Sequence, residues 1–123
     1  LIELARIYES LQEHNLHPYH LKIKELEQLV SQYFKTYKSP SFYADKMNMS
    51  LKHLNRICKN VLDITLTDFI YSKIILESKR LLSANVMTIG EVASELGFEN
   101  YSYFTKIFKK YTNLTPKGFK ELV

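Results

Sequence analysis

The 123-residue sequence contains little of what several classes of protein require. It has one cysteine, three glycines, three prolines and no tryptophan. One cysteine cannot build a disulfide framework or a cysteine-rich zinc site, and it is typical of a reducing, cytoplasmic compartment. The few glycines and prolines argue against a turn-rich sandwich or barrel and against a disordered linker. No apolar run approaches the roughly 20 residues that a membrane helix needs, so we expect no membrane span.

Positive charge is unevenly distributed along the sequence. Hydrophobic residues make up 46% of the chain, enough for the core of one domain or of two very small ones. The net charge is +4, but residues 1–30 carry −2 and residues 31–123 carry +6. From residue 100 onward, five lysines stand against one glutamate. This excess favours a partner that carries phosphates, although many solvated helix faces are equally rich in lysine.

Apolar residues recur at three- and four-residue spacing nearly throughout, and no alternating strand pattern competes with them. This periodicity predicts an all-α fold, with a leader helix and loop over residues 1–20 and a helix over about 21–37. We expect each later helix to begin at a residue whose side chain can cap it. These expected capping residues are Ser39, Ser50, Thr65, Thr88, Asn100 and Thr115.

Two stretches of the sequence repeat each other at an offset of 49 or 50 residues. Residues 40–62 and residues 88–112 each predict a short helix, a tight turn and a longer basic helix. A predicted helix over about 65–83 separates them. That helix of about 19 residues would be roughly 28 Å long. Successive major-groove segments on one face of DNA lie about 34 Å apart, so one chain can present a helix to each of them.

The turn inside each unit has the residue types of a helix-turn-helix. A small residue, Ala44 or Ala93, is followed four positions later by Asn48 or Gly97, the types that best tolerate positive φ. Two helices joined by such a turn form a helix-turn-helix. Two ordinary helical hairpins are the alternative interpretation. Two copies in register, each with a basic second helix, favour DNA binding.

The repeated units carry the motifs of a known family. The segment from about residue 22 to 123 resembles the DNA-binding domain of AraC/XylS-type bacterial transcription regulators. The motifs that carry this resemblance are Ser50-x-x-x-Leu54-x-Arg56-x-x-Lys59, Ile89-Gly90-Glu91-Val92-Ala93-x-x-x-Gly97-Phe98, Ser102-Tyr103-Phe104-Thr105-Lys106-x-Phe108-Lys109-Lys110 and Thr115-Pro116. The sequence departs from the family pattern at Asn113, where glycine is usual, and at Phe119-Lys120, where Tyr-Arg is common.

The resemblance implies an architecture and a set of partners. It implies a domain over residues 21–123, with seven helices in two helix-turn-helix subdomains joined by a long central helix. Residues 1–20 would then be the tail of an N-terminal sensing or dimerisation region, through which the full-length protein forms a homodimer. The implied role is activation or repression through contact with RNA polymerase.

Recognition helices read base edges from their outward-facing positions near the helix N-terminus. The arginine of the first unit suits guanine, because its guanidinium can pair with both O6 and N7, and the neighbouring asparagine suits adenine. Solvated surface is the alternative for each residue. The candidates for base contact are Lys52, Asn55, Arg56, Tyr101, Ser102, Thr105 and Lys106. We expect Tyr103, Phe104 and Phe108 to lie mostly in the core.

A second group of residues suits the DNA backbone. Lysines, capping hydroxyls and helix N-termini bind phosphate oxygens, which fixes the register of a protein on DNA without reading its sequence. The candidates for phosphate contact are Ser50, His53, Lys59, Lys109, Lys110, Thr115 and Lys117.

The sequence offers no constellation for catalysis, a metal or a cofactor. His17 and His20 have no Asp or Cys at ligand spacing. Cys58 is expected in the core or at its boundary, and one cysteine is too few for the DNA-repair methyl acceptors that carry a similar domain. We therefore expect sequence-specific binding of double-stranded DNA and no enzyme activity. The alternative is a helical protein-interaction module that binds an acidic partner through Lys106, Lys109 and Lys110.

Overall fold

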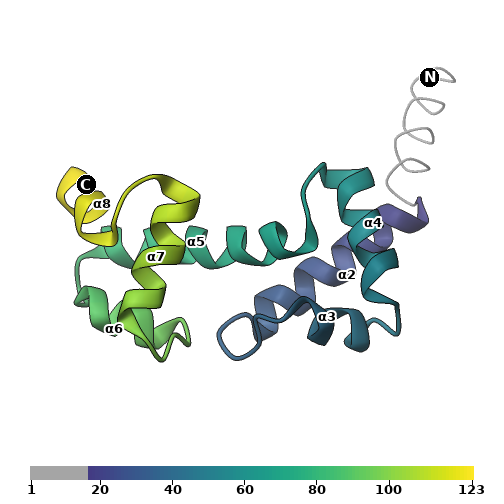
Figure 1. Ribbon diagram of the computed structural model, residues 1–123, viewed down its shortest axis with the longest axis horizontal. Coiled ribbons are helices and arrows are strands. Elements are labelled where there is room, and N and C mark those ends of the chain that lie inside the picture. Colours follow the sequence, from purple (N-terminus) through teal and green to yellow (C-terminus); the bar gives the residue numbers. More distant parts are fainter. Residues whose placement is uncertain (1–16) are drawn as a thin grey trace, which may run out of the picture.

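A computed structural model of the chain describes residues 17–123, and this part of the protein consists of helices, turns and loops without a strand. The predicted all-α fold is therefore confirmed for these residues. Within residues 17–123, seven helices follow one another (Figure 1). They are α2 (Pro18–Tyr33), α3 (Pro40–Lys46), α4 (Leu51–Leu62), α5 (Leu66–Ala84), α6 (Ile89–Glu95), α7 (Tyr101–Thr112) and α8 (Pro116–Leu122). The predicted leader helix falls mostly on residues 1–16, which lie outside the described residues.

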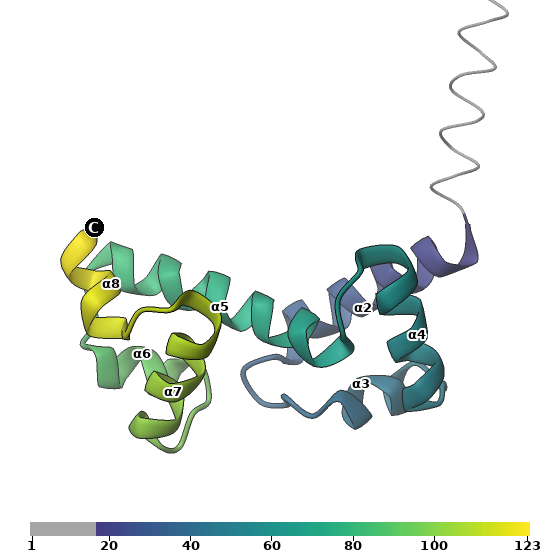
Figure 2. The ribbon, with the colours of Figure 1, turned by 45° about the horizontal axis from the view of Figure 1, so that its top comes forward.

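The helices form two groups at the two ends of α5 (Figures 1 and 2). We call α2, α3 and α4, with the first half of α5, the first lobe. The second lobe is α6, α7 and α8 with the second half of α5. Within each lobe the helices pack on one another and on α5. The long helix is therefore both the connection and a wall of each core: Leu66 and Ile70 are buried in the first lobe, and Leu82 is buried in the second.

Side-chain caps set where most of these helices begin. An oxygen of the residue before the helix accepts a hydrogen bond from a backbone N–H of the first turn, which otherwise has no partner. Thr88 does so within a complete capping box with Glu91. The predicted caps that make this bond are Ser50, Thr65, Thr88, Asn100 and Thr115. Ser39 occupies the capping position of α3, but its side chain makes no such bond.

The first helix differs from its predicted range. We expected it over about 21–37, and α2 spans Pro18–Tyr33. It begins early because His17 Nδ1 accepts a hydrogen bond from the Tyr19 backbone N–H and Pro18 holds the first helical position. It ends early because a turn over residues 34–36 and a loop over residues 37–39 follow Tyr33. This connection brings Lys35 and Lys38 towards the second lobe.

The structure repeats as the sequence does. α4 and α7 have the same length, and their residues have the same order of exposed and buried positions at an offset of 50. The turns match as well: Asn48 (φ 55°) corresponds to Gly97 (φ 84°), and Asp63 (φ 59°) corresponds to Asn113 (φ 64°). The positive φ at residue 113 explains why asparagine can stand where the family usually has glycine.

Candidate nucleic-acid interface

One face of α4 is charged and points away from the core. Lys52, Arg56 and Lys59 follow one another at spacings of four and three residues, so they share one side of the helix, and all three are exposed. Leu54 and Ile57 lie on the opposite side and are buried. The hydrophobic core therefore fixes the rotation of α4 about its axis and turns the basic face outward.

The matching face of α7 carries the equivalent positions. Ser102, Lys106 and Lys109 are exposed and occupy the positions of Lys52, Arg56 and Lys59. Tyr101, the first residue of the helix, is also half exposed, so its ring is accessible at the end of this face. Lys110 lies beside this face, with its Nζ atom 5.6 Å from the centre of the Tyr111 ring. On this face, α7 therefore has a serine in place of Lys52 and a lysine in place of Arg56.

The electrostatics of the two helices are one-sided. Neither α4 nor α7 contains an aspartate or a glutamate, and each carries three lysine or arginine side chains. Within residues 17–123, none of these six cations is in a salt bridge; the ion pairs found there lie elsewhere. Their charges are therefore available to an anionic partner.

Asn55 does not have the outward orientation that we expected. Its side chain is partly buried, and Oδ1 accepts a hydrogen bond of 2.9 Å from the Leu66 backbone N–H. Leu66 is the first residue of α5, whose N–H has no partner within its own helix. Asn55 thus joins α4 to the start of α5, and the helix spacing used for the prediction could not reveal this because the partner lies on another element.

Thr105 also differs from its expected orientation. It occupies the position of Asn55 in the second repeat, and its hydroxyl oxygen is buried without a hydrogen-bond partner. The residue that corresponds to Leu66 is Pro116, which has no N–H to donate. The bond made by Asn55 therefore has no counterpart in the second lobe. The other predicted base-contact positions of both helices are exposed.

The expected phosphate contacts lie at the surface or at helix starts. Ser50 Oγ accepts from the His53 N–H at 3.1 Å, and Thr115 Oγ1 accepts from the Gly118 N–H at 3.0 Å. The hydroxyl proton of each remains available to donate. The His53 ring is exposed and packs in a T-shaped arrangement with the Tyr19 ring, with 6.2 Å between the ring centres. The remaining candidates are exposed lysines, namely Lys59, Lys109, Lys110 and Lys117.

A tyrosine cluster that we did not predict holds α7 against α5. The Tyr111 hydroxyl donates to Asp68 Oδ1 at 3.0 Å, and the Tyr111 ring stacks on Tyr71 at 5.8 Å. Burial, helped by the neighbouring Tyr103, raises the pKa of Tyr71. Tyr103 itself, which we expected in the core, is about half exposed. Burial, helped by the Asp68 carboxylate, raises the pKa of Tyr111 to about 12. Asp68 lies in the first turn of α5, 43 positions from Tyr111, so local spacing in the sequence gave no signal of this bond.

The single cysteine lies in the core, as expected. Cys58 is completely buried, and this burial raises the pKa of its thiol to about 11, so it stays protonated near neutral pH. No three His, Cys, Asp or Glu side chains lie together in the described part of the chain in a way that could hold a metal. In the same residues, no helix is both long and apolar enough to cross a membrane.

Two small helix-turn-helix lobes on one long helix define a recognised class of domain. Residues 43–121 match the family described as "Helix-turn-helix domain", and this match covers more than half of the chain. The chain belongs to this AraC-type helix-turn-helix family. The predicted family, and the two helix-turn-helix units within an all-α fold, are thereby confirmed.

Named relatives are similar over the same region. "Probable transcription factor PqrA" of Proteus vulgaris is 37% identical over 78 residues, which are 63% of this chain and 64% of that protein. "Bifunctional transcriptional activator/DNA repair enzyme AdaA" of Bacillus subtilis is 33% identical over 79 residues, 64% of this chain and 37% of that protein. The aligned region therefore spans less than two thirds of either relative.

Solved structures have the same fold. The C-terminal domain of AraT, a response regulator from Geobacillus stearothermophilus, superposes with a TM-score of 0.76 at 22% identity, covering 88% of each chain. The DNA-binding domain of AdpA, a global transcriptional factor solved in complex with a target DNA, gives a TM-score of 0.72 at 16% identity. That match covers 80% of this chain and 89% of the other.

Proposed function

We propose that this chain is the DNA-binding part of a bacterial transcription regulator and binds double-stranded DNA sequence-specifically. α4 and α7 enter successive major-groove segments. The observation that carries the proposal is the duplicated helix with an exposed, acid-free, cationic face, once in each lobe. The 19-residue helix α5, which joins the two lobes, is about 28 Å long, close to the 34 Å between such groove segments. Membership of the AraC-type family and relatives named as transcription factors support the same conclusion.

The exposed faces suggest a role for each side chain. Arg56 is the candidate for a two-bond contact with guanine, and Lys52 lies one turn closer to the helix start. In α7, Tyr101, Ser102 and Lys106 take the corresponding roles. Tyr101 suits a thymine methyl group or a phosphate, and Lys106 supplies a single-point donor with less base specificity.

The geometry limits what two of the predicted base contacts, Asn55 and Thr105, can offer to DNA. Asn55 keeps only its amide NH₂ for DNA, because its oxygen is held by Leu66. Thr105 would have to expose a buried hydroxyl. The backbone contacts proposed for the interface are Ser50, His53, Lys59, Lys109, Lys110, Thr115 and Lys117.

The full-length protein extends this proposal. The relatives are longer than the matched region, so we propose that a further region senses a signal and joins two copies into a homodimer. We also propose contact with RNA polymerase at the promoter and a cytoplasmic location, where the DNA is. The chain itself acts by binding and performs no catalysis.

Selection of bound DNA from a random pool tests the proposal directly. The expected product is one or two conserved blocks, each read by one helix, with their centres about one helical turn apart. Mobility shifts at moderate salt should then show that the selected DNA binds at least 100-fold more tightly than a scrambled sequence, within the usual range for specific recognition. Equal affinity for both sequences would refute specific recognition.

A second candidate is a helical module that binds an acidic protein. The observation in its favour is the lysine cluster of α7, because Lys106, Lys109 and Lys110 are exposed single-point donors that suit carboxylates as well as phosphates. Competition separates the two candidates. Captured protein that excess double-stranded DNA does not displace would support this second candidate.

A further inference from the structure

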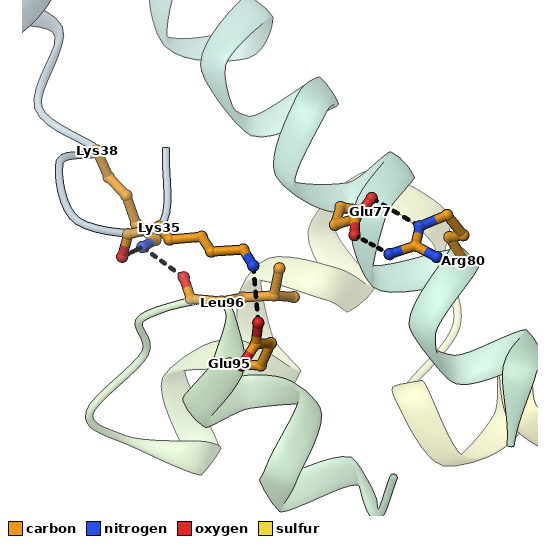
Figure 3. A network of polar contacts seen from close by, with 6 residues as sticks. All are labelled: Lys35, Lys38, Glu77, Arg80, Glu95 and Leu96. Atoms are coloured by element: carbon orange, nitrogen blue, oxygen red, sulfur yellow. Dashed lines mark hydrogen bonds and ion pairs between the residues drawn. The ribbon is translucent and has the colours of Figure 1, made fainter. Parts of the chain in front are cut away.

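One ammonium group lies at the junction of the two lobes. Lys38, in the loop between α2 and α3, donates to the Leu96 carbonyl oxygen at 2.7 Å and to the Lys35 carbonyl oxygen at 3.2 Å (Figure 3). It also donates to the Phe34 carbonyl oxygen at 3.2 Å. Its three donors are thus used by carbonyls at the ends of two helices, α2 in the first lobe and α6 in the second. A cation is favoured there by the partial negative charge of both helix ends.

The surroundings of this ammonium strengthen the contact. Its Nζ atom lies 4.8 Å from the centre of the Phe98 ring, which belongs to the helix-turn-helix turn of the second lobe. Lys38 is partly buried, and this burial lowers the pKa of its side chain. A hydrogen bond between partly desolvated groups is stronger than one at the open surface.

Gly97 allows the two lobes to approach this closely. A Cβ atom at this position would lie 1.8 Å from the Lys35 carbonyl oxygen and 2.9 Å from Lys38 Nζ, closer than atoms can pack. The equivalent residue in the first lobe is Asn48, which has a side chain at a similar positive φ. Positive φ alone therefore does not require glycine in this chain. Glycine is required at residue 97 because the backbone of the other lobe comes so close.

The rest of the junction is sparse. Lys35 and Glu95 form an ion pair of 2.7 Å across it, but both side chains are nearly half exposed, so the pair contributes little by itself (Figure 3). The other pair in Figure 3, Glu77 with Arg80, lies within α5. Beside the junction, a hollow of about 450 Å³ lies between the end of α2 and the middle of α5, and Lys73 and Leu76 form part of its lining. Apart from α5, no broad helix-to-helix packing joins the described parts of the lobes.

We propose that Lys38 and Gly97 lock the two lobes in one relative orientation, and that they are positioning residues for DNA recognition. Leu96 and Gly97 form the turn that leads into α7, so the lock acts on the direction of that helix relative to α4. We call these contacts the inter-lobe clamp. The clamp itself does not depend on DNA, and its effect on DNA recognition rests on the proposed function.

The clamp determines which spacing of two DNA sub-sites the chain accepts. One extra base pair between the sub-sites moves the second by about 3.4 Å and rotates it by about 35° around the DNA axis. A clamped protein cannot follow that rotation with both helices. A protein without the clamp can follow it further, because apart from α5 only the exposed Lys35–Glu95 ion pair then joins the described parts of the lobes.

A distance measurement tests the clamp without DNA. Spin labels at Gln28→Cys on α2 and Glu121→Cys on α8, both exposed positions, report the separation of the lobes by pulsed electron paramagnetic resonance. The chain without added cysteines is the labelling control, since Cys58 is buried. We expect one narrow distance in the parent chain and a distribution at least twice as wide in Lys38→Met. Lys46→Met removes the same charge from a lysine that contacts rings within the first lobe, and should leave the distribution unchanged.

A second variant pair tests the close approach independently. Gly97→Asn places a side chain against the Lys35 carbonyl and should shift the distance. Asn48→Gly exchanges the same residue types at the equivalent turn, away from the junction, and should not. If Lys38→Met loses its helical circular dichroism, this pair carries the test. Distance distributions for Lys38→Met or Gly97→Asn that match the parent chain in the folded state would overturn the clamp.

The effect on recognition is measured with the DNA selected from the random pool. We expect insertion of one base pair between the sub-sites to weaken binding of the parent chain and of Lys46→Met at least tenfold, and of Lys38→Met less than threefold. Equal losses in all three would overturn the role of the clamp in recognition. If the parent chain prefers no DNA sequence, the proposed function fails, and the distance measurements still decide whether the clamp exists.

Discussion

Replacing Asn55 with alanine should destabilise the protein, because Asn55 supports the start of α5. Its Oδ1 atom is 2.9 Å from the Leu66 nitrogen, and Leu66 is only 1% exposed. Removing the acceptor leaves this N–H without a partner in a place that water hardly reaches. Such a loss costs about 1–3 kcal/mol. In a domain of about 100 residues, each kcal/mol lowers the melting temperature by about 4–8 °C.

Urea unfolding followed by circular dichroism measures this effect, and two variants serve as controls. Asn55→Asp keeps an acceptor and adds a negative charge near the N-terminus of α5, so it should stay within about 0.5 kcal/mol of the parent chain. Asn60→Ala changes an exposed asparagine on the same helix and should also have little effect. If Asn55→Ala is as stable as Asn60→Ala, the hydrogen bond to Leu66 does not support α5.

Three further predictions follow from the same structure. Thr105→Val removes a buried hydroxyl that has no partner and should raise the free energy of unfolding by about 1 kcal/mol, measured by urea unfolding; a loss of stability would show that the hydroxyl has a partner. In mobility shifts, Arg56→Ala should cost about 1–3 kcal/mol and relax preference at one base position, whereas Lys109→Ala should weaken all sequences alike and reduce the salt dependence; indistinguishable effects would contradict the assigned roles. The folded state holds the Cys58 proton up to a pKa of about 11, against about 9 when unfolded, so it binds more protons than the unfolded state between these values, and stability should fall as the pH rises from about 9 to 11. Unfolding of Cys58→Ala at the same pH values should show a smaller fall, and an equal fall would assign the effect to other groups.

Local patterns predicted most of the helices. Ser50, Thr65 and Thr88 cap the helices that they were expected to cap, because a capping bond forms between residues three positions apart. The first helix was placed too late, since the cap made by a histidine side chain at residue 17 and the turn after Tyr33 have no strong local pattern. The repeat was visible because two copies of one unit conserve the same spacing.

The candidate site was predicted less completely. Helical periodicity correctly predicted that Lys52, Arg56 and Lys106 point outward. It predicted the same orientation for Asn55 and Thr105, but in the structure their side-chain oxygens point inward. The rotation of a helix is set by its core face, but a position at the edge of that face can turn either way. What decides is whether a neighbouring element offers a hydrogen-bond partner.

The sequence by itself determined the all-α class, the duplicated helix-turn-helix and the family, because these depend on spacing along the chain. Tertiary structure alone decided how the two copies meet. Lys38, Leu96 and Gly97 come from segments about 60 residues apart, and their contacts exist only once both lobes have folded on α5. Glycine at residue 97 could be explained from the sequence by positive φ. The fold shows a second reason, which is that the backbone of the other lobe occupies the space of its missing side chain.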